Sequence, residues 1–166
     1  SPKAIAVAAQ NIGATVLHIS TDYVFNGQNH TPYKERDPTD PLGVYGKSKL
    51  LGEIGVRENC DRHLILRTAW VYGSRGHGNF VKTMLRLGSE RTELKVVTDQ
   101  IGSPSWSYDI AIAITQLLPK SWADENINGI YHFTNSGVAS WYDLALATFN
   151  EAKQLGFPVK VEQVIP

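Results

Sequence analysis

Tyr45 and Lys49 are four residues apart in a stretch whose composition is typical of a helix. On an α-helix this spacing places both side chains on the same face, one turn from each other. A free phenol has a pKa of about 10 and exchanges protons poorly at neutral pH. A neighbouring ammonium favours the phenolate, whereas burial opposes it. The pair therefore has the chemistry of a general acid assisted by a cation, although the spacing alone also fits a solvated helix face.

A second polar group, Ser20-Thr21-Asp22-Tyr23, follows the apolar stretch 15–20, which is typical of a buried strand. In open parallel sheets, ligands bind beyond the carboxyl ends of the strands. Hydroxyl and carboxylate groups at this position could orient a substrate. The alternative is that they only satisfy the amides of a turn.

A third candidate region surrounds a glycine-rich turn at residues 73–78. Asn79 follows this turn and opens a predicted helix, whose N-terminal amides would favour an anion, and Arg75 adds a cation. A turn with no ligand fits the same spacing. Trp70, just upstream, is either a core tryptophan or a flat wall for a sugar or base ring.

Alternating helices and strands are predicted along the whole chain, which indicates an α/β domain with parallel strands. Residues 24–43 are rich in proline, glycine and charge, so they predict a long surface loop before the Tyr45 helix. Ser140 is expected to cap a helix. The predicted helices are 2–13, one that begins after residue 43 and carries Tyr45 and Lys49, 79–91, 107–118 and 141–156. The predicted strands are 15–20, 63–73, 93–97, 129–134 and the final residues from 158.

Composition limits the classes of function. The 166 residues are 42% hydrophobic and 19% charged, with 16 basic and 16 acidic residues, which fits one globular domain and gives no basic stripe for nucleic acid or a membrane surface. A single cysteine allows no internal disulfide and suits the cytoplasm. The five histidines lack ligand spacing, so no structural metal site is expected.

Several phrases taken together carry a family resemblance. The chain resembles the dTDP-4-dehydrorhamnose reductases, extended short-chain dehydrogenase/reductases that act on sugar nucleotides. The likeness runs in the same order over nearly the whole chain, through STDYVFNG (20–27), PYKERDPTDPLGVYGKSKLLGE (32–53), ILRTAWVYG (65–73), GNFVKTMLRL (78–87) and VVTDQIGSPS (96–105).

The resemblance implies reduction of the C4 keto group of dTDP-4-dehydro-6-deoxy-L-mannose to dTDP-L-rhamnose by NADPH or NADH. Tyr45 would be the general acid, Lys49 would assist it and hold the nicotinamide ribose, and Thr21 would hydrogen-bond the substrate oxygen. The expected nicotinamide neighbours are Thr68 and Ala69, and the expected substrate-binding residues are Asp22, Tyr23, Trp70 and Asn79.

The family's N-terminal glycine-rich turn is not found in this sequence. We therefore expect a partial Rossmann-like fragment of a doubly wound parallel sheet, plus a small α/β substrate-binding region. Residues 1–73 would carry the dinucleotide-binding part, and residues 74–166 mostly the substrate part, with elements returning to the sheet. The fragment alone is expected to be inactive, and its bare sheet edge could form a homodimer.

Other readings stay open at this point. A sugar-nucleotide epimerase or dehydratase of the same fold would share the tyrosine and lysine. A non-catalytic regulatory subunit could retain the same residues as relics. The cofactor preference and a divalent ion at a subunit contact are not determined by the sequence.

Overall fold

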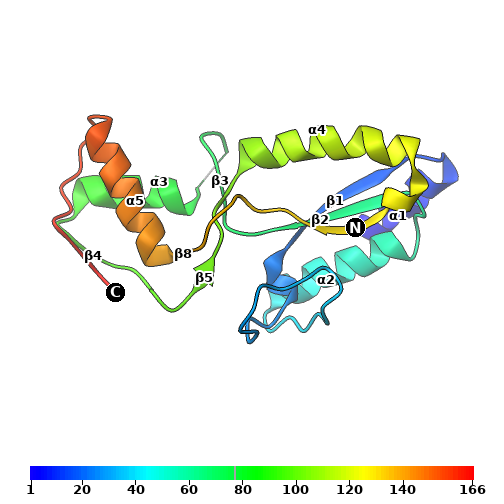
Figure 1. The fold of residues 1–166 in the computed structure, drawn as a ribbon, viewed down its shortest axis with the longest axis horizontal. Helices are drawn as coiled ribbons and strands as arrows, with labels where there is room; N and C mark the ends of the chain where they lie inside the picture. The colour runs from blue at the N-terminus through cyan, green and yellow to red at the C-terminus, as the bar shows by residue number, and fades with distance from the viewer. Residues whose placement is uncertain (77) are drawn as a thin grey trace. The chain divides into compact units, whose positions relative to one another are not determined.

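The computed structural model describes residues 1–76 and 78–166. The chain divides into two compact units, whose elements are labelled in Figure 1. The first unit comprises residues 1–69 and 110–133, and the second comprises residues 70–109 and 134–166. No helix in the described part of the chain is both long and apolar enough to cross a membrane.

A three-stranded parallel sheet organises the first unit. It consists of β1 (Val16–Thr21), β2 (His63–Thr68) and β7 (Gly129–His132), in the order β1-β2-β7. The central strand is the most buried, because it has a neighbour on each side, and its Leu64 and Ile65 are fully inaccessible to solvent. These strands confirm the predicted α/β class with parallel strands. Strand β1 begins one residue later than predicted.

Two helices of the first unit pack against each other and against β1. They are α1 (Pro2–Asn11) and α2 (Val44–Arg57). A side chain at Gly55 would press on Lys3, with its Cβ at 3.0 Å, so this glycine allows the close approach of α2 to α1. The apolar cluster beneath α1 consists of Ala6, Ala9, Val56, Cys60 and Ile65.

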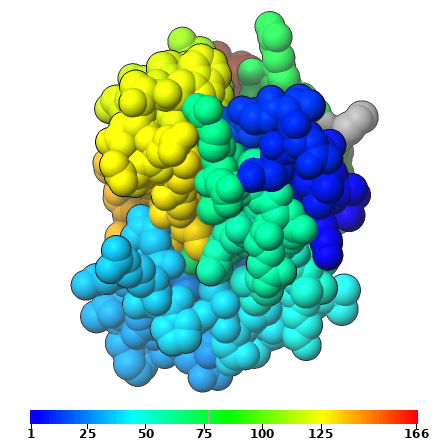
Figure 2. All heavy atoms as spheres, turned by 90° about the vertical axis from the view of Figure 1, so that its right-hand side faces the viewer, coloured from blue at the N-terminus to red at the C-terminus, as the bar shows by residue number. Residues whose placement is uncertain are grey.

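A long loop separates η1 (Asp22–Val24), a single 3₁₀ turn, from α2. Its ends are joined by a hydrogen bond from the Asp40 amide to the Val24 carbonyl, at 3.0 Å. Its interior is filled by Tyr33, whose ring stacks on Phe25 with 4.2 Å between centroids. The predicted surface loop is therefore confirmed, and Figure 2 shows it in pale blue as a surface continuous with the cyan of α2.

The prediction of one strand over residues 63–73 is wrong. Strand β2 ends at Thr68, and Trp70 then adopts a left-handed backbone with a φ of 48°, which redirects the chain. The next strand, β3 (Val71–Tyr72), belongs to the second unit, where it pairs with β6 (Ser105–Trp106). The Trp70 carbonyl accepts a hydrogen bond from the Ser105 amide, which holds this change of direction.

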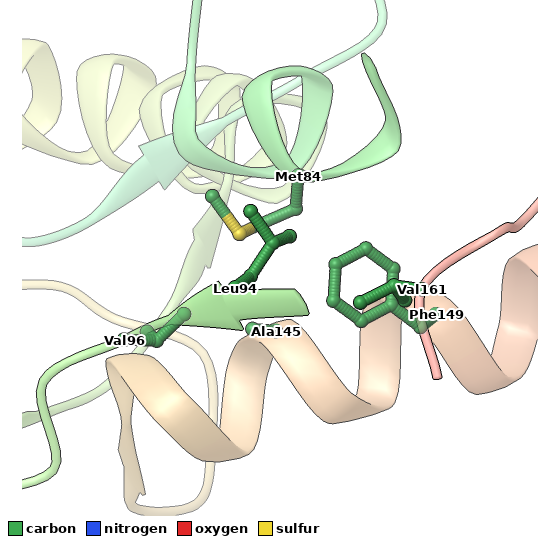
Figure 3. Packing of buried hydrophobic residues seen from close by; sticks show 6 residues of the cluster. All are labelled: Met84, Leu94, Val96, Ala145, Phe149 and Val161. Carbon is green, nitrogen blue, oxygen red and sulfur yellow. The ribbon is translucent and has the colours of Figure 1, made fainter. Parts of the chain in front are cut away.

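The second unit is built around two helices, α3 (Phe80–Glu90) and α5 (Trp141–Gln154). Its short strand pairs are β4 (Glu93–Lys95) with β9 (Gln163–Ile165), which are parallel, and β5 (Ile101–Gly102) with β8 (Ala139–Ser140), which are antiparallel. Figure 3 shows part of its core, in which Leu94 of β4 lies between helices α3 and α5. The buried cluster consists of Met84, Leu94, Val96, Ala145, Phe149 and Val161.

The remaining elements are α4 (Ser107–Ala123) and η2 (Glu125–Ile127). Helix α4 begins in the second unit, and from Ile110 its residues belong to the first unit, which η2 and β7 complete. The chain thus returns to the first sheet after building part of the second unit.

Candidate functional site

The carboxyl ends of β1 and β2 bring two threonines together. Thr21 and Thr68 are directly opposite each other in the parallel register, and both are buried. The Thr21 hydroxyl donates to the Asp22 carboxylate at 2.9 Å and accepts from the Tyr23 amide at 3.3 Å. The Thr68 hydroxyl is buried and has no hydrogen-bond partner within the described residues. An unpaired buried hydroxyl is costly, so this position favours a polar partner from outside the chain.

Tyr45 lies in the first turn of α2 and is 58% exposed. Its ring meets Tyr23 edge-on, with 5.9 Å between centroids. Between these tyrosines, Gly46 packs so tightly that an added Cβ would overlap the Tyr23 carbonyl oxygen. Gly46 therefore sets the distance between the start of α2 and the turn after β1. Our sequence reasoning missed this role, which a glycine inside a predicted helix could have signalled.

Lys49 lies one turn further along α2 and reaches the sheet. Its ammonium donates to the Ile19 carbonyl of β1 at 2.6 Å. Ile19 lies two residues before Thr21 on β1, so Lys49 links α2 to the strand before Thr21. Tyr45 links α2 to Tyr23, in the turn after Thr21. The structure thus places Lys49 against the strand before Thr21 and Tyr45 against the turn that follows it.

A buried ion pair lies beneath this group. Glu53 and Arg67 are almost fully inaccessible and form a bidentate pair, with Arg67 Nε to Glu53 Oε1 at 2.9 Å and Arg67 Nη2 to Glu53 Oε2 at 2.7 Å. The Ser20 hydroxyl also donates to Glu53, at 2.5 Å. Sequence reasoning did not find this pair, because Glu53 and Arg67 lie on different elements and neither has a local signal.

Arg67 also connects the sheet to the long loop. Its Nη1 donates to the Glu35 carbonyl at 3.3 Å, and the Glu35 carboxylate accepts from the His132 amide at 3.1 Å. Hydrogen bonds from backbone amides hold the pKa of Glu35 below its usual value. Burial lowers the pKa of His132, an effect that Arg67 reinforces and Glu35 opposes.

Asp22 sits beside the candidate catalytic threonine in a partly desolvated position. Burial raises the pKa of the Asp22 carboxyl, and the hydrogen bond from Thr21 limits that rise. As long as Asp22 is ionised, it accepts the proton of the Thr21 hydroxyl. The Asp22 carboxylate thereby orients this hydroxyl.

In the second unit, Trp70 is part of an aromatic stack. Its ring lies on Trp141 with 3.6 Å between centroids and an interplanar angle of 9°, and Trp141 in turn packs on Phe80. Gly102 approaches the same indole so closely that a Cβ there would lie 2.7 Å from it. One face of Trp70 is therefore covered by protein, which fixes the ring rigidly.

Asn79 is the N-cap of α3, which begins one residue later than the predicted helix. Its side-chain oxygen accepts from the Lys82 amide at 3.0 Å, and its amide donates to the Gly73 carbonyl at 2.8 Å. These contacts give Asn79 a structural role that is independent of any ligand. The predicted glycine-rich anion site includes His77, which lies outside the described residues.

Residues 1–76 and 78–166 contain no group of three or more acidic, histidine or cysteine side chains that could hold a metal ion.

Known proteins match the chain along its whole length. The family model of the RmlD substrate binding domain matches residues 1–165. The dTDP-4-dehydrorhamnose reductase of Escherichia coli K12 is 44% identical over 164 residues, which is 99% of this chain and 54% of that protein. The spore coat polysaccharide biosynthesis protein SpsK of Bacillus subtilis is 49% identical over 147 residues, covering 89% of this chain and 50% of that protein.

Solved structures show the same likeness. A crystal structure of dTDP-4-dehydrorhamnose reductase from Bacillus anthracis in complex with NADP has a TM-score of 0.89 and 42% identity, covering 99% of this chain and 54% of that one. The Bordetella bronchiseptica enzyme WbmG, in complex with NAD and UDP, shares the fold at a TM-score of 0.79 and 20% identity. The chain spans about half the length of the curated relatives it matches. On the match of residues 1–165, the chain belongs to the RmlD substrate binding domain family.

Proposed function

We propose that these residues serve the NAD(P)H-dependent reduction of the C4 keto group of dTDP-4-dehydro-6-deoxy-L-mannose to dTDP-L-rhamnose. The observation that carries this proposal is that α2 holds Tyr45 against the turn after Thr21 and Lys49 against the strand before it, at the carboxyl end of a parallel strand. The relatives named dTDP-4-dehydrorhamnose reductase support the choice of substrate.

Tyr45 is the general acid in this proposal. Reduction of a ketone places negative charge on its oxygen, which a phenol can protonate from the exposed face of α2. Lys49, fixed on the Ile19 carbonyl, supplies a cation near that phenol and has further N–H groups for a ribose hydroxyl. Thr21 donates its hydroxyl proton to the same substrate oxygen, and this hydrogen bond takes the place of the one that Thr21 makes to Asp22 in the structure.

The residues fit a nicotinamide at the end of β2. A reduced nicotinamide, when bound, supplies the hydride for this reaction. The unpaired Thr68 hydroxyl offers a hydrogen-bonding group to such a ligand, and Ala69 beside it is the second proposed contact. The cofactor is NADPH or NADH, and the NADP complex of the Bacillus anthracis relative supports the former.

In the first unit, Asp22 and Tyr23 follow β1 and are the proposed sugar-nucleotide contacts. In the second unit, the proposed contacts are Trp70 and Asn79. We assign the cofactor and catalytic side to residues 1–73 and the substrate side mostly to residues 74–166. We further propose a cytoplasmic enzyme that does not bind nucleic acid or membranes and that forms a homodimer.

An activity assay tests this proposal. The assay uses the longest natural form of the protein that contains these residues. The substrates are dTDP-4-dehydro-6-deoxy-L-mannose and either NADPH or NADH. We expect oxidation of the reduced cofactor together with formation of dTDP-L-rhamnose. An epimerised or dehydrated product without net oxidation of the cofactor would contradict the assignment, and so would binding of the sugar nucleotide without turnover.

A further inference from the structure

The buried pair Glu53–Arg67 joins the three segments that carry the candidate catalytic side chains. Glu53 is on α2, four residues after Lys49 and eight after Tyr45, and so on the same side of the helix. Ser20, which donates to Glu53, immediately precedes Thr21 on β1. Arg67, its ion-pair partner, immediately precedes Thr68 on β2.

The contacts of this network restrict how α2 can rotate or slide. Both oxygens of Glu53 are engaged, Oε1 by Ser20 and Arg67 Nε, and Oε2 by Arg67 Nη2. A planar guanidinium that binds a carboxylate at two points fixes direction as well as distance. A shift of α2 along its axis would therefore break hydrogen bonds that cannot be replaced by water, because both side chains are buried.

Burial also argues against a role in stability alone. Replacing a buried ion pair with apolar side chains of similar size is often neutral or stabilising, so such a pair is weak evidence for added stability. Arg67 in addition holds the loop through the Glu35 carbonyl and lies over the Phe25 ring at 5.1 Å. One side chain thus connects the helix, both strands and the loop around the proposed site.

We propose that Glu53, together with Arg67 and Ser20, is a positioning residue that sets Tyr45 and Lys49 against Thr21. The network does not touch the reacting atoms. It fixes the rotation and height of α2 on the ends of β1 and β2. This inference rests on the proposed function for its kinetic readout, but its structural readout is independent of activity.

The test compares two double variants, each of which neutralises both partners of one ion pair. The variant Glu53→Gln/Arg67→Gln removes the buried charges, and Glu90→Gln/Arg86→Gln removes the exposed pair of α3, which is the matched control. We expect the buried variant to lose about 100-fold in kcat with little change in KM, as a small misplacement of reacting groups would cause. We also expect faster hydrogen exchange at the amides of Lys47 to Lys49, and neither change in the control.

If the variant of the buried pair has the same hydrogen-exchange rates and the same kcat as the wild-type protein, the proposal is overturned. If that variant does not fold, Ser20→Ala decides by the same two readouts, because it removes a single hydrogen bond to Glu53. If the wild-type protein shows no reductase activity, the proposed function fails, and hydrogen exchange at the start of α2 alone decides whether the network positions the helix.

Discussion

At the scale of single residues, Gly46 shows how a backbone contact can position a candidate catalytic group. A glycine in a helix costs about 1 kcal/mol relative to alanine. Here that cost is offset by a contact with the Tyr23 carbonyl that no side chain allows. The position of Tyr45 therefore depends on the absence of a methyl group at the next residue.

We predict that Gly46→Ala destabilises the protein by about 1–3 kcal/mol, despite its better helix propensity, because the added Cβ forces α2 away from the turn after β1. Thermal or chemical unfolding measures the change. Gly43→Ser, in open space at the N-cap of the same helix, is the control and is expected to be neutral or mildly stabilising. A Gly46→Ala protein as stable as wild type would contradict the packing described here.

His132 gives the stability a predictable dependence on pH. Its pKa is lowered by burial from the ordinary value of 6.5, so the folded state resists protonation while the unfolded state accepts it. The unfolded state then binds more protons below pH 6.5, and stability falls as the pH decreases through that value. The loss is complete once the pH is below the lowered pKa of the folded state.

We expect the decrease in melting temperature between about pH 7 and pH 5 to become smaller in His132→Asn. The exposed His30 provides the control variant His30→Asn, which should follow the wild-type curve. An unchanged slope in His132→Asn would assign the pH dependence to other groups, such as His18, whose pKa burial also lowers.

At the scale of elements, the start of α5 is specified by adjacent residues. The Ser140 hydroxyl accepts from the Asp143 amide at 3.0 Å, and the Asp143 carboxylate accepts from the Ser140 amide at 2.8 Å, which is a complete capping box. These hydrogen bonds hold the pKa of Asp143 below its usual value.

Ser140→Ala should destabilise the protein by about 1 kcal/mol, the usual cost of losing a side-chain cap. Chemical denaturation provides the measurement. Ser89→Ala is the comparison, because Ser89 lies on the exposed surface of α3 and bonds only to a carbonyl of its own helix. Equal stability of the two variants would show that the capping box contributes little to α5.

Local signals explain which elements were predictable. The cap at Ser140, the loop after η1 and the strands β1 and β7 follow from residues next to one another in sequence. The end of β2 could not be predicted in this way, because no residue near Trp70 indicates a left-handed backbone. That backbone is held by a hydrogen bond from Ser105, which is distant in sequence. The Glu53–Arg67 pair was equally hidden, since Glu53 resembles any charged residue on an exposed helix face.

At the scale of the whole molecule, β1 stands at one edge of the first unit's sheet as the described residues form it. Ile19 on this strand is 37% exposed, and Ile5 of α1 and Ile12, which directly follows α1, are also exposed to solvent. An exposed edge with apolar neighbours is a template for pairing with another chain.

We expect the 166-residue chain to self-associate in sedimentation experiments, and Ile19→Lys to weaken that association by placing a charge on the edge. Val138→Lys, at an exposed apolar position of the second unit, should leave association unchanged. A monomeric wild-type chain would contradict the homodimer proposed above.

The catalytic assignment depends on the Tyr45 hydroxyl, and a single-atom change tests it most directly. Tyr45 and Tyr108 are equally exposed, at 58%, so Tyr108→Phe is a matched control for Tyr45→Phe. Reduction of the dTDP-linked keto sugar by NADPH is measured for both variants. The account predicts that kcat falls by about 100- to 10,000-fold in Tyr45→Phe alone, with sugar-nucleotide binding retained. A Tyr45→Phe enzyme that reduces the sugar at the wild-type rate would contradict it.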